Sequence, residues 1–310
     1  MMVRADMDSF LPPLIPPCCS PAMPLVLQPR LLPDPPLAVD FSGLTPDRLA
    51  GRPAAALAVL GVLADGRSCP LESLFHLQGS PADEVLQLVG DFSHVHSIGA
   101  KMARGMIRVE GSVGRHAAEG MTGGRLEVAG DAGDWLAAEM EGGEVEVAGR
   151  AGHNVAAALP GSPQGMRGGV VTVAGAVGDL AGARMRRGLL AIGGGCGEAA
   201  ALELRAGTVV VAGTLQRGAG LGMRRGTLLA IDGPLPIPVT FAPGALWQPS
   251  FLPLLAVRLA RSGFRPGGRA PQHLFSGLWQ HWHGDALAGG RGEILHRPSQ
   301  AVRAAGPKNR

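Results

Sequence analysis

The chain has 310 residues, of which 46% are apolar, so it is long enough to bury a sizeable core as one or two domains. Its formal net charge is only +3, and all of its 28 basic residues except Lys101 and Lys308 are arginine, which is weak evidence for phosphate or nucleic-acid binding. No run approaches the ~18 apolar residues that a membrane span requires, so we expect no membrane partner.

The first 23 residues are apolar but interrupted by prolines, and two early aspartates make them unlike a signal peptide. We expect residues 1–23 to be disordered or to precede the true start, for which Met23 is a candidate. The four cysteines are Cys18, Cys19, Cys69 and Cys196. Their spacing matches no zinc or iron–sulfur pattern, which favours reduced thiols in a cytoplasmic protein.

Residues 24–85 are predicted to form an N-terminal cap of strands and helices. Residues 25–27 are predicted to form a short strand, and Thr45 before a proline and an acid is typical of a helix start. The alanine- and leucine-rich residues 53–66 are predicted to continue as helix. Ser80, followed by a proline, indicates a second short helix over 80–86.

A Met-x-x-Gly unit then recurs through residues 86–233, which we expect to form a β-helix. The methionines are Met102, Met121, Met140, Met166, Met185 and Met223, and Leu204 fills the one missing position. The step is 19 residues except in the fourth repeat, where seven extra residues lie within 159–165. A period of about 20 residues sustained over this length is typical of a solenoid.

Further columns recur at the same step. Two aliphatic positions alternate with polar ones in each repeat, as at Val145 and Val147, which is the pattern of a half-buried strand. A glycine follows two residues later, at Gly111, Gly130, Gly149, Gly175, Gly194 and Gly213. We interpret these glycines as structural corners that need either positive φ or close approach between coils. The sequence predicts an all-β fold, a parallel β-helix of about seven ~19-residue coils with small helical caps.

The repeat decays after Gly226, and residues 234–295 are predicted to form a C-terminal helical cap and extension. Residues 251–262 resemble a helix that Gly263 ends, and we expect this helix to close the end of the rod. Residues 284–295 are expected to be ordered. Residues 296–310 are predicted to be a disordered tail.

Several side-chain patterns suggest metal chemistry, but each has a structural alternative. The methionine column is interpreted as an inner packing seam, because Met fills irregular gaps well. His94 with His96, and His281 with His283, are candidate ligand pairs, yet neither pair has a third ligand at a convincing spacing. We therefore predict no metal site.

The predominant charge changes along the coils, from acidic in the early coils to basic in the later ones. Glu127 and Glu146 share one outward column, which is compatible with a carboxylate pair in a β-helix enzyme or with two solvated acids. In the later coils arginines stand just after the methionine column, at Arg167, Arg186, Arg187, Arg205, Arg224 and Arg225. Stacked arginines of this kind are either a surface that binds carboxylates or phosphates, or an edge of the rod that contacts only solvent. Nucleic acid is disfavoured because no aromatic side chains interleave the arginines.

The coil pattern G-x-x-G…M-x-G-G-x-[VL]-x-V-x-G resembles the GXGXG β-helix at the end of glutamate synthase large subunits. The whole chain is more similar to the C-subunit of formylmethanofuran dehydrogenase, and most similar to the C-subunit of the bacterial formyltransferase/hydrolase complex. Residues 44–51, the coils from about 90 to 233, and the segments 251–264 and 284–295 carry this resemblance, which extends from about 24 to 295. It implies a right-handed coil.

The resemblance also implies a structural subunit without its own active site or catalytic residues. The complex would convert formyl-tetrahydromethanopterin to formate through a methanofuran-type carrier in one-carbon metabolism, with hydrolase, transferase and dehydrogenase-like subunits as partners. The carrier's polyglutamate tail is an imaginable ligand of the arginines, although no cofactor is expected to bind this subunit directly. The alternatives are a free-standing glutamate-synthase-like scaffold and a β-helix enzyme that acts on an acidic polymer.

Overall fold

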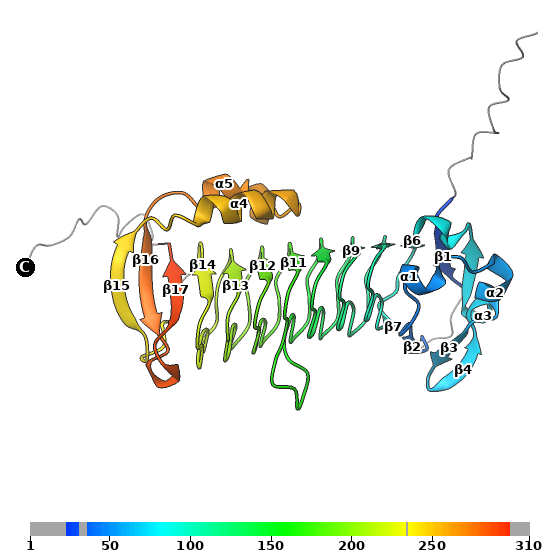
Figure 1. The fold of residues 1–310 in the computed structure, drawn as a ribbon, viewed down its shortest axis with the longest axis horizontal. Coiled ribbons are helices and arrows are strands. Elements are labelled where there is room, and N and C mark those ends of the chain that lie inside the picture. Colours follow the sequence, from blue (N-terminus) through cyan, green and yellow to red (C-terminus); the bar gives the residue numbers. More distant parts are fainter. Residues whose placement is uncertain (1–22, 31–35, 234, 298–310) are drawn as a thin grey trace, which may run out of the picture.

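The structure, a computed structural model, describes residues 23–30, 36–233 and 235–297, which form an elongated parallel β-helix with a cap at each end (Figure 1). The expectations for residues 1–22 and 298–310, and with them Cys18 and Cys19, lie outside the described residues. Within the described ranges, no helix is long and apolar enough to cross a membrane.

The N-terminal cap combines a small four-stranded sheet, the first strands of the long sheet that runs along the rod, and short helices. Its elements are β1 (Leu25–Pro29), β2 (Val39–Asp40), α1 (Pro46–Leu49), α2 (Ala54–Ala58), β3 (Gly61–Ala64), β4 (Arg67–Pro70), α3 (Leu71–Leu74), β5 (Phe75–Gln78), the 3-10 turn η1 (Pro81–Asp83), β6 (Val85–Leu88) and β7 (Val95–His96). Three buried phenylalanines, Phe41, Phe75 and Phe92, lie with ring centroids 5.1 to 6.3 Å apart. An aromatic cluster therefore forms the core of the cap.

Two helix predictions for this cap are wrong in part. The helix expected over 53–66 ends at Ala58, because the next residues alternate between exposed and buried and pair as the β3–β4 hairpin. The helix expected over 80–86 is a single 3-10 turn, and strand β6 begins at Val85. Thr45 does precede a helix, but its buried hydroxyl makes no capping hydrogen bond.

The coils stack through parallel strands of four residues each. These are β8 (Met106–Val109), β9 (Arg125–Val128), β10 (Glu144–Val147), β11 (Val170–Val173), β12 (Leu189–Ile192), β13 (Thr208–Val211) and β14 (Thr227–Ala230). Each pairs in parallel with its neighbours without a shift, so that Val145 lies between Leu126 and Val171. The 26-residue fourth repeat keeps this register, so its seven extra residues leave the stack unchanged.

A second ladder runs along the rod as single parallel bridges, from Phe92 through Val113 and Ala132 to Leu215. Between these two ladders the methionine column is fully buried, which confirms that it is an inner seam. The third side of the coil has positive φ at every second residue, as at His116 and Ala118. Sequence reasoning missed this side, because alanine, histidine and tryptophan occupy positions that favour glycine.

The corner glycines are required by close approach between coils. None of the six has positive φ. A β-carbon on Gly175 would lie 2.5 Å from the carbonyl oxygen of Gly149, and one on Gly213 would lie 2.6 Å from the carbonyl carbon of Gly194. Positive φ belongs instead to the glycines that precede the strands, such as Gly143 at +91°.

The C-terminal region comprises β15 (Ala242–Trp247), α4 (Leu252–Arg261), the 3-10 turn η2 (Pro266–Gly268), α5 (Pro271–Leu274), β16 (Trp279–Gly284), the 3-10 turn η3 (Ala286–Ala288) and β17 (Gly292–His296). The expectation that the helix closes the rod is wrong. The end is covered by β17, which pairs in parallel with β14, and by β16 and β15, which continue the sheet antiparallel.

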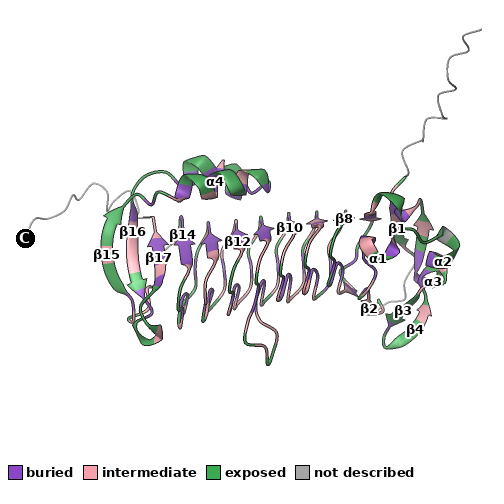
Figure 2. Cartoon of the chain, in the orientation of Figure 1, coloured by how far each residue is buried: buried purple, intermediate pink, exposed green. Residues whose placement is uncertain are grey.

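Helices α4 and α5 instead lie along the flank of the rod, beside strands β11 to β14 (Figure 1). The buried side of α4 faces these strands (Figure 2). Leu252, Ala256 and Leu259 pack there in a second core against outward residues such as Val210 and Leu229. The outward face of the later strands is apolar for this reason.

Candidate functional site

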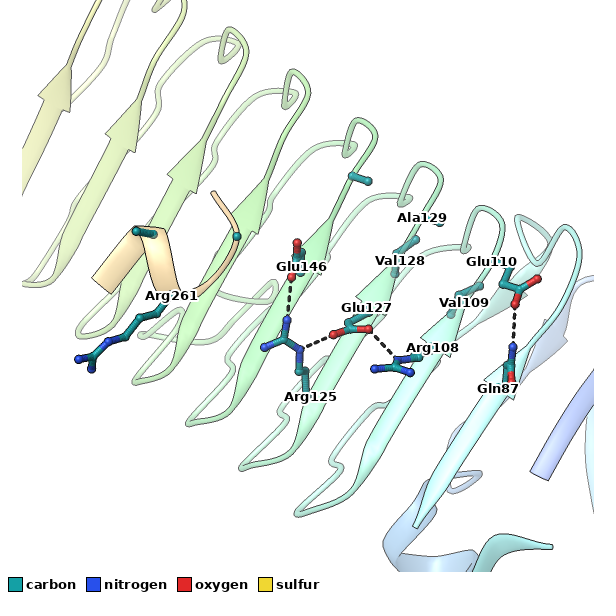
Figure 3. Close-up of a pocket in the computed structure, with 13 residues that line it drawn as sticks. Gln87, Arg108, Val109, Glu110, Arg125, Glu127, Val128, Ala129, Glu146 and Arg261 are labelled. Atoms are coloured by element: carbon teal, nitrogen blue, oxygen red, sulfur yellow. Dashed lines mark hydrogen bonds and ion pairs between the residues drawn. The ribbon is translucent and has the colours of Figure 1, made fainter. Parts of the chain in front are cut away.

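A charged groove lies where the helices stop covering the sheet. Its floor is the outward face of strands β6, β8, β9 and β10, and the end of α4 forms one wall (Figure 3). The groove has a volume of about 550 Å³. A β-carbon on Gly263, just after α4, would lie 2.9 Å from Glu146 Oε1, so the helix end packs directly against that carboxylate.

Arg125 is the centre of an ion-pair network in this groove. Its Nε lies 2.6 Å from Glu127 Oε1, its Nη1 lies 3.0 Å from Glu144 Oε2, and its Nη2 lies 2.9 Å from Glu146 Oε2. Arg108 Nε reaches the other oxygen of Glu127 at 2.9 Å. Figure 3 shows Arg125 between Glu146 and Glu127, with Arg108 on the far side of Glu127. Three carboxylates therefore share two guanidinium groups in this network.

The network gives the two stacked glutamates different pKa values. Burial by itself would raise the pKa of Glu127, but hydrogen bonds from Arg125 and Arg108 outweigh it and hold the pKa below its ordinary value. Burial raises the pKa of Glu146, and although Arg125 opposes this effect, Glu127 and Glu144 add to the rise. Both side chains are fixed by Arg125, so they are not a free pair of acids facing solvent.

The sequence placed Glu127 and Glu146 in one outward column, and the structure stacks them in adjacent strands. Sequence reasoning missed Arg108 and Arg125, which stand at outward positions of the same group of strands. The sequence did contain a signal for them, because these arginines and the glutamates occupy alternate, outward positions of the strand segments. The contact of Arg258 in α4 with Glu144, at 3.7 Å, had no signal, because it depends on where the helix packs.

The arginine column forms a second candidate surface, on the corner that precedes each strand. The backbone N–H of Arg186 donates to the carbonyl of Met166 at 2.8 Å, that of Arg205 to Met185 at 2.9 Å, and that of Arg224 to Leu204 at 2.7 Å. Successive arginines are thus one coil apart, or ~4.8 Å. In water, two unit charges at that distance repel by about 1 kcal/mol.

The members of this column differ in their partners. Arg167, at its start, forms an ion pair with Glu141 at 2.6 Å. Within the described residues, Arg186, Arg205 and Arg224 form no ion pair, and neither do the flanking Arg187 and Arg225. The structure therefore stacks uncompensated positive charge over three consecutive coils.

The histidines have structural roles on the rod. His96 Nδ1 accepts a hydrogen bond from the Arg115 backbone N–H at 3.1 Å, and His153 Nδ1 accepts one from the Asp179 N–H at 3.0 Å. Asp134 makes the same kind of bond to the next coil. His153 is itself exposed, and its side chain links adjacent coils.

The other side chains that could ligate a metal do not form a metal site among the described residues. His281 and His283 lie with ring centroids 3.9 Å apart, and His281 Nε2 is 3.2 Å from Glu293 Oε2. Even so, no three His, Cys, Asp or Glu side chains in the described ranges are arranged to hold a metal ion. Burial raises the pKa of the Cys196 thiol to about 12, so it is not a ready thiolate.

The chain is similar to known proteins in both sequence and structure. No protein-family profile matches the chain. Over 77 residues, 24% of its length, it is 34% identical to the C-subunit of molybdenum-containing formylmethanofuran dehydrogenase 1 of Methanosarcina barkeri, and this stretch spans only 26% of that protein. One component of the crystal structure of the formyltransferase/hydrolase complex (FhcABCD) from Methylorubrum extorquens, determined in complex with methylofuran, is similar at a TM-score of 0.78. That match has 32% identity and covers 88% of this chain and 100% of the other.

Proposed function

Because this chain belongs to the C-subunit family of formylmethanofuran dehydrogenases, we propose that it is the non-catalytic structural subunit of a formyltransferase/hydrolase complex. Its partners are then the hydrolase, transferase and dehydrogenase-like subunits, in the cytoplasm. The complex converts formyl-tetrahydromethanopterin to formate through a methanofuran-type carrier in one-carbon metabolism. The observation that carries this proposal is the match over the full length of a chain from such a complex.

The arrangement of charges supports a scaffold role. An enzyme that acts on an acidic polymer would need carboxylates free to exchange protons with a substrate. In the groove, Glu127 and Glu146 are both engaged by Arg125, and a bound polyanion would compete with four glutamates that line or adjoin the site. A rod of stacked coils instead offers long, rigid surfaces on which several subunits can assemble.

Within this proposal the arginine column is the anion- or partner-binding surface. Arg186, Arg205 and Arg224 are the members without a partner in the described residues, and a carboxylate-bearing ligand would neutralise them. Two sources of carboxylates fit: an acidic segment of a neighbouring subunit, and the polyglutamate tail of the carrier. No binding residue is assigned outside this column and its flanking Arg187 and Arg225.

Purification of the chain with its native neighbours tests the proposal. We expect stable co-elution with large hydrolase and transferase subunits, and formyl transfer and hydrolysis by the complex. The isolated chain should show neither activity. Turnover by the isolated chain, or its elution without those subunits from a lysate that contains them, would refute the assignment.

Charge reversal tests the column. Arg186→Glu combined with Arg205→Glu should weaken assembly or carrier use, because the surface then repels carboxylates. Arg67→Glu combined with Arg150→Glu is the matched control, since both are exposed arginines outside the column and the change in net charge is the same. Equal behaviour of the two double variants would remove the column from the proposed function.

A further inference from the structure

The spacing of the unpaired arginines restricts the shape of a ligand that contacts all of them. Arg186, Arg205 and Arg224 occupy consecutive coils, so the column spans two coil steps, or ~9.6 Å. Adding Arg167 extends it to three steps, or ~14.4 Å. A partner that lies along the rod must present carboxylates at the same interval.

A helix meets this requirement and an extended strand does not. Helix positions i, i+3 or i+4, and i+7 lie on one face and span ~10.5 Å, within about 1 Å of the column. Strand positions i, i+2 and i+4 also share a face but span ~13 Å, which leaves them out of register by more than about 3 Å after two steps. Arginine side chains accommodate the small mismatch with a helix more readily than the larger mismatch with a strand.

Exposed leucines lie beside the C-terminal end of the column. Leu221, three residues before Arg224, is 38% exposed, and Leu287 in the C-terminal cap is 87% exposed. The Asp285 carboxylate accepts hydrogen bonds from the backbone N–H of Gly222 at 3.0 Å and of Leu287 at 2.9 Å, which joins the two loops. The charged column thus ends at apolar side chains held in place by a buried aspartate.

We infer that this column is the docking surface for an acidic amphipathic α-helix of a partner protein, which lies along the rod with an apolar side chain against Leu221 and Leu287. The inference rests on the proposed function, since it specifies the partner at the same site. Acidic residues at i, i+3, i+7 and i+10 of that helix pair with successive arginines, and its apolar residue contacts the leucines. Salt weakens the complex, because most of the surface is exposed charge.

Three synthetic probes test this on the full-length isolated chain by calorimetry. The first is a hydrocarbon-stapled helix of about 15 residues with acids at i, i+3, i+7 and i+10 and a terminal leucine. The second has the same composition and staple, but its acids are spread around the helix. The third is poly-L-glutamate of equal charge, which is extended at neutral pH and represents a flexible polyanion. We expect the patterned helix to bind at least tenfold more tightly than either control.

Variants of the chain show where the patterned helix binds. Arg186→Glu with Arg205→Glu should weaken its binding at least tenfold, and Arg67→Glu with Arg150→Glu should not. Leu287→Ser is expected to weaken it severalfold without changing the salt dependence. If charge reversal prevents folding, as judged by circular dichroism, Arg186→Gln with Arg205→Gln replaces it and should give a smaller loss of the same sign.

Each other outcome contradicts the inference. Tighter binding of poly-L-glutamate would point to a flexible polyanion, and equal binding of both stapled helices would show that the spacing is irrelevant. Failure of all three probes would exclude an acidic helix at this surface. If the hydrolase and transferase subunits still co-elute with the native chain in these cases, the proposed function stands and only the helix-docking inference fails.

Discussion

Replacement of Arg125 by glutamine should measurably weaken the rod, because one guanidinium serves three carboxylates there. The change removes ion pairs to Glu127, Glu144 and Glu146 at 2.6 to 3.0 Å. Arg108 still reaches Glu127, and Arg258 still reaches Glu144, but Glu146 keeps no cationic contact of the network. Glu127 of β9 then lies beside Glu144 and Glu146 of β10 without the guanidinium between them.

The size of the loss follows from exposure. Exposed ion pairs contribute about 0.2–1 kcal/mol each. Glu144 and Glu146 are 40% and 38% exposed, so solvent screening places their pairs in the lower part of that range. We expect Arg125→Gln to lower the free energy of unfolding by about 1–2 kcal/mol at neutral pH and low salt. Arg150→Gln, at an exposed arginine without an ion pair among the described residues, should change it by less than about 0.5 kcal/mol.

The pH dependence distinguishes lost ion pairs from lost packing. Arg125 helps to hold the pKa of Glu127 below its ordinary value of 4.5. Stabilisation by that carboxylate is therefore present above 4.5 and disappears as the pH falls through the lowered pKa. The difference between wild type and Arg125→Gln should be largest at neutral pH and should shrink on acidification below 4.5.

Urea unfolding followed by circular dichroism, at several pH values and at low and high salt, measures this difference. A loss that is independent of both pH and salt would refute the ion-pair explanation and would indicate packing by the side-chain stem. A loss below about 0.5 kcal/mol at neutral pH and low salt would show that the network contributes nothing measurable.

Three further changes probe other parts of the molecule. Met185→Ala, at a fully buried inner position, should cost about 2–5 kcal/mol in urea unfolding, and no loss would contradict the inner seam. Leu259→Asp should release α4 from the sheet, seen as faster hydrogen exchange in the helix while the coils stay protected; unchanged exchange would argue against the second core. Burial lowers the pKa of His96, so its stabilisation is present above 6.5 and is lost as the pH falls through the lowered value. His96→Asn keeps an acceptor for the Arg115 N–H, so we expect the urea midpoint of this variant to fall less than that of the wild type as the pH drops below 6.5. An equal fall in both proteins would exclude His96 as the source of this pH dependence.

Much of the rod was predictable from the sequence because each coil repeats the same physical problem. Buried positions such as Met185 and Val145 recur at a fixed step, and a parallel stack places equivalent residues on top of one another. The arginine column was predictable for the same reason. It was not predictable that most arginines of the column lack an ion-pair partner among the described residues, because Arg167 stands in the same column and pairs with Glu141.

Features that join distant parts of the chain were harder to predict. Helix α4 was correctly placed in sequence but wrongly placed in space, because its apolar face fits either the end of the rod or its flank. The apolar outward residues of the later strands, such as Val210 and Leu229, decide for the flank. Likewise, the composition of residues 53–66 favours helix, whereas pairing between β3 and β4 determines the structure.

The sequence by itself determined the solenoid, its period, its inner methionine seam and the column that carries the arginines, because all of these follow from a local pattern repeated at short range. Only the tertiary structure decided where the C-terminal helices lie, that Arg258 of α4 reaches Glu144, and which arginines have no partner in the described residues. These features depend on contacts between residues far apart in the chain. Periodicity carries no information about such contacts.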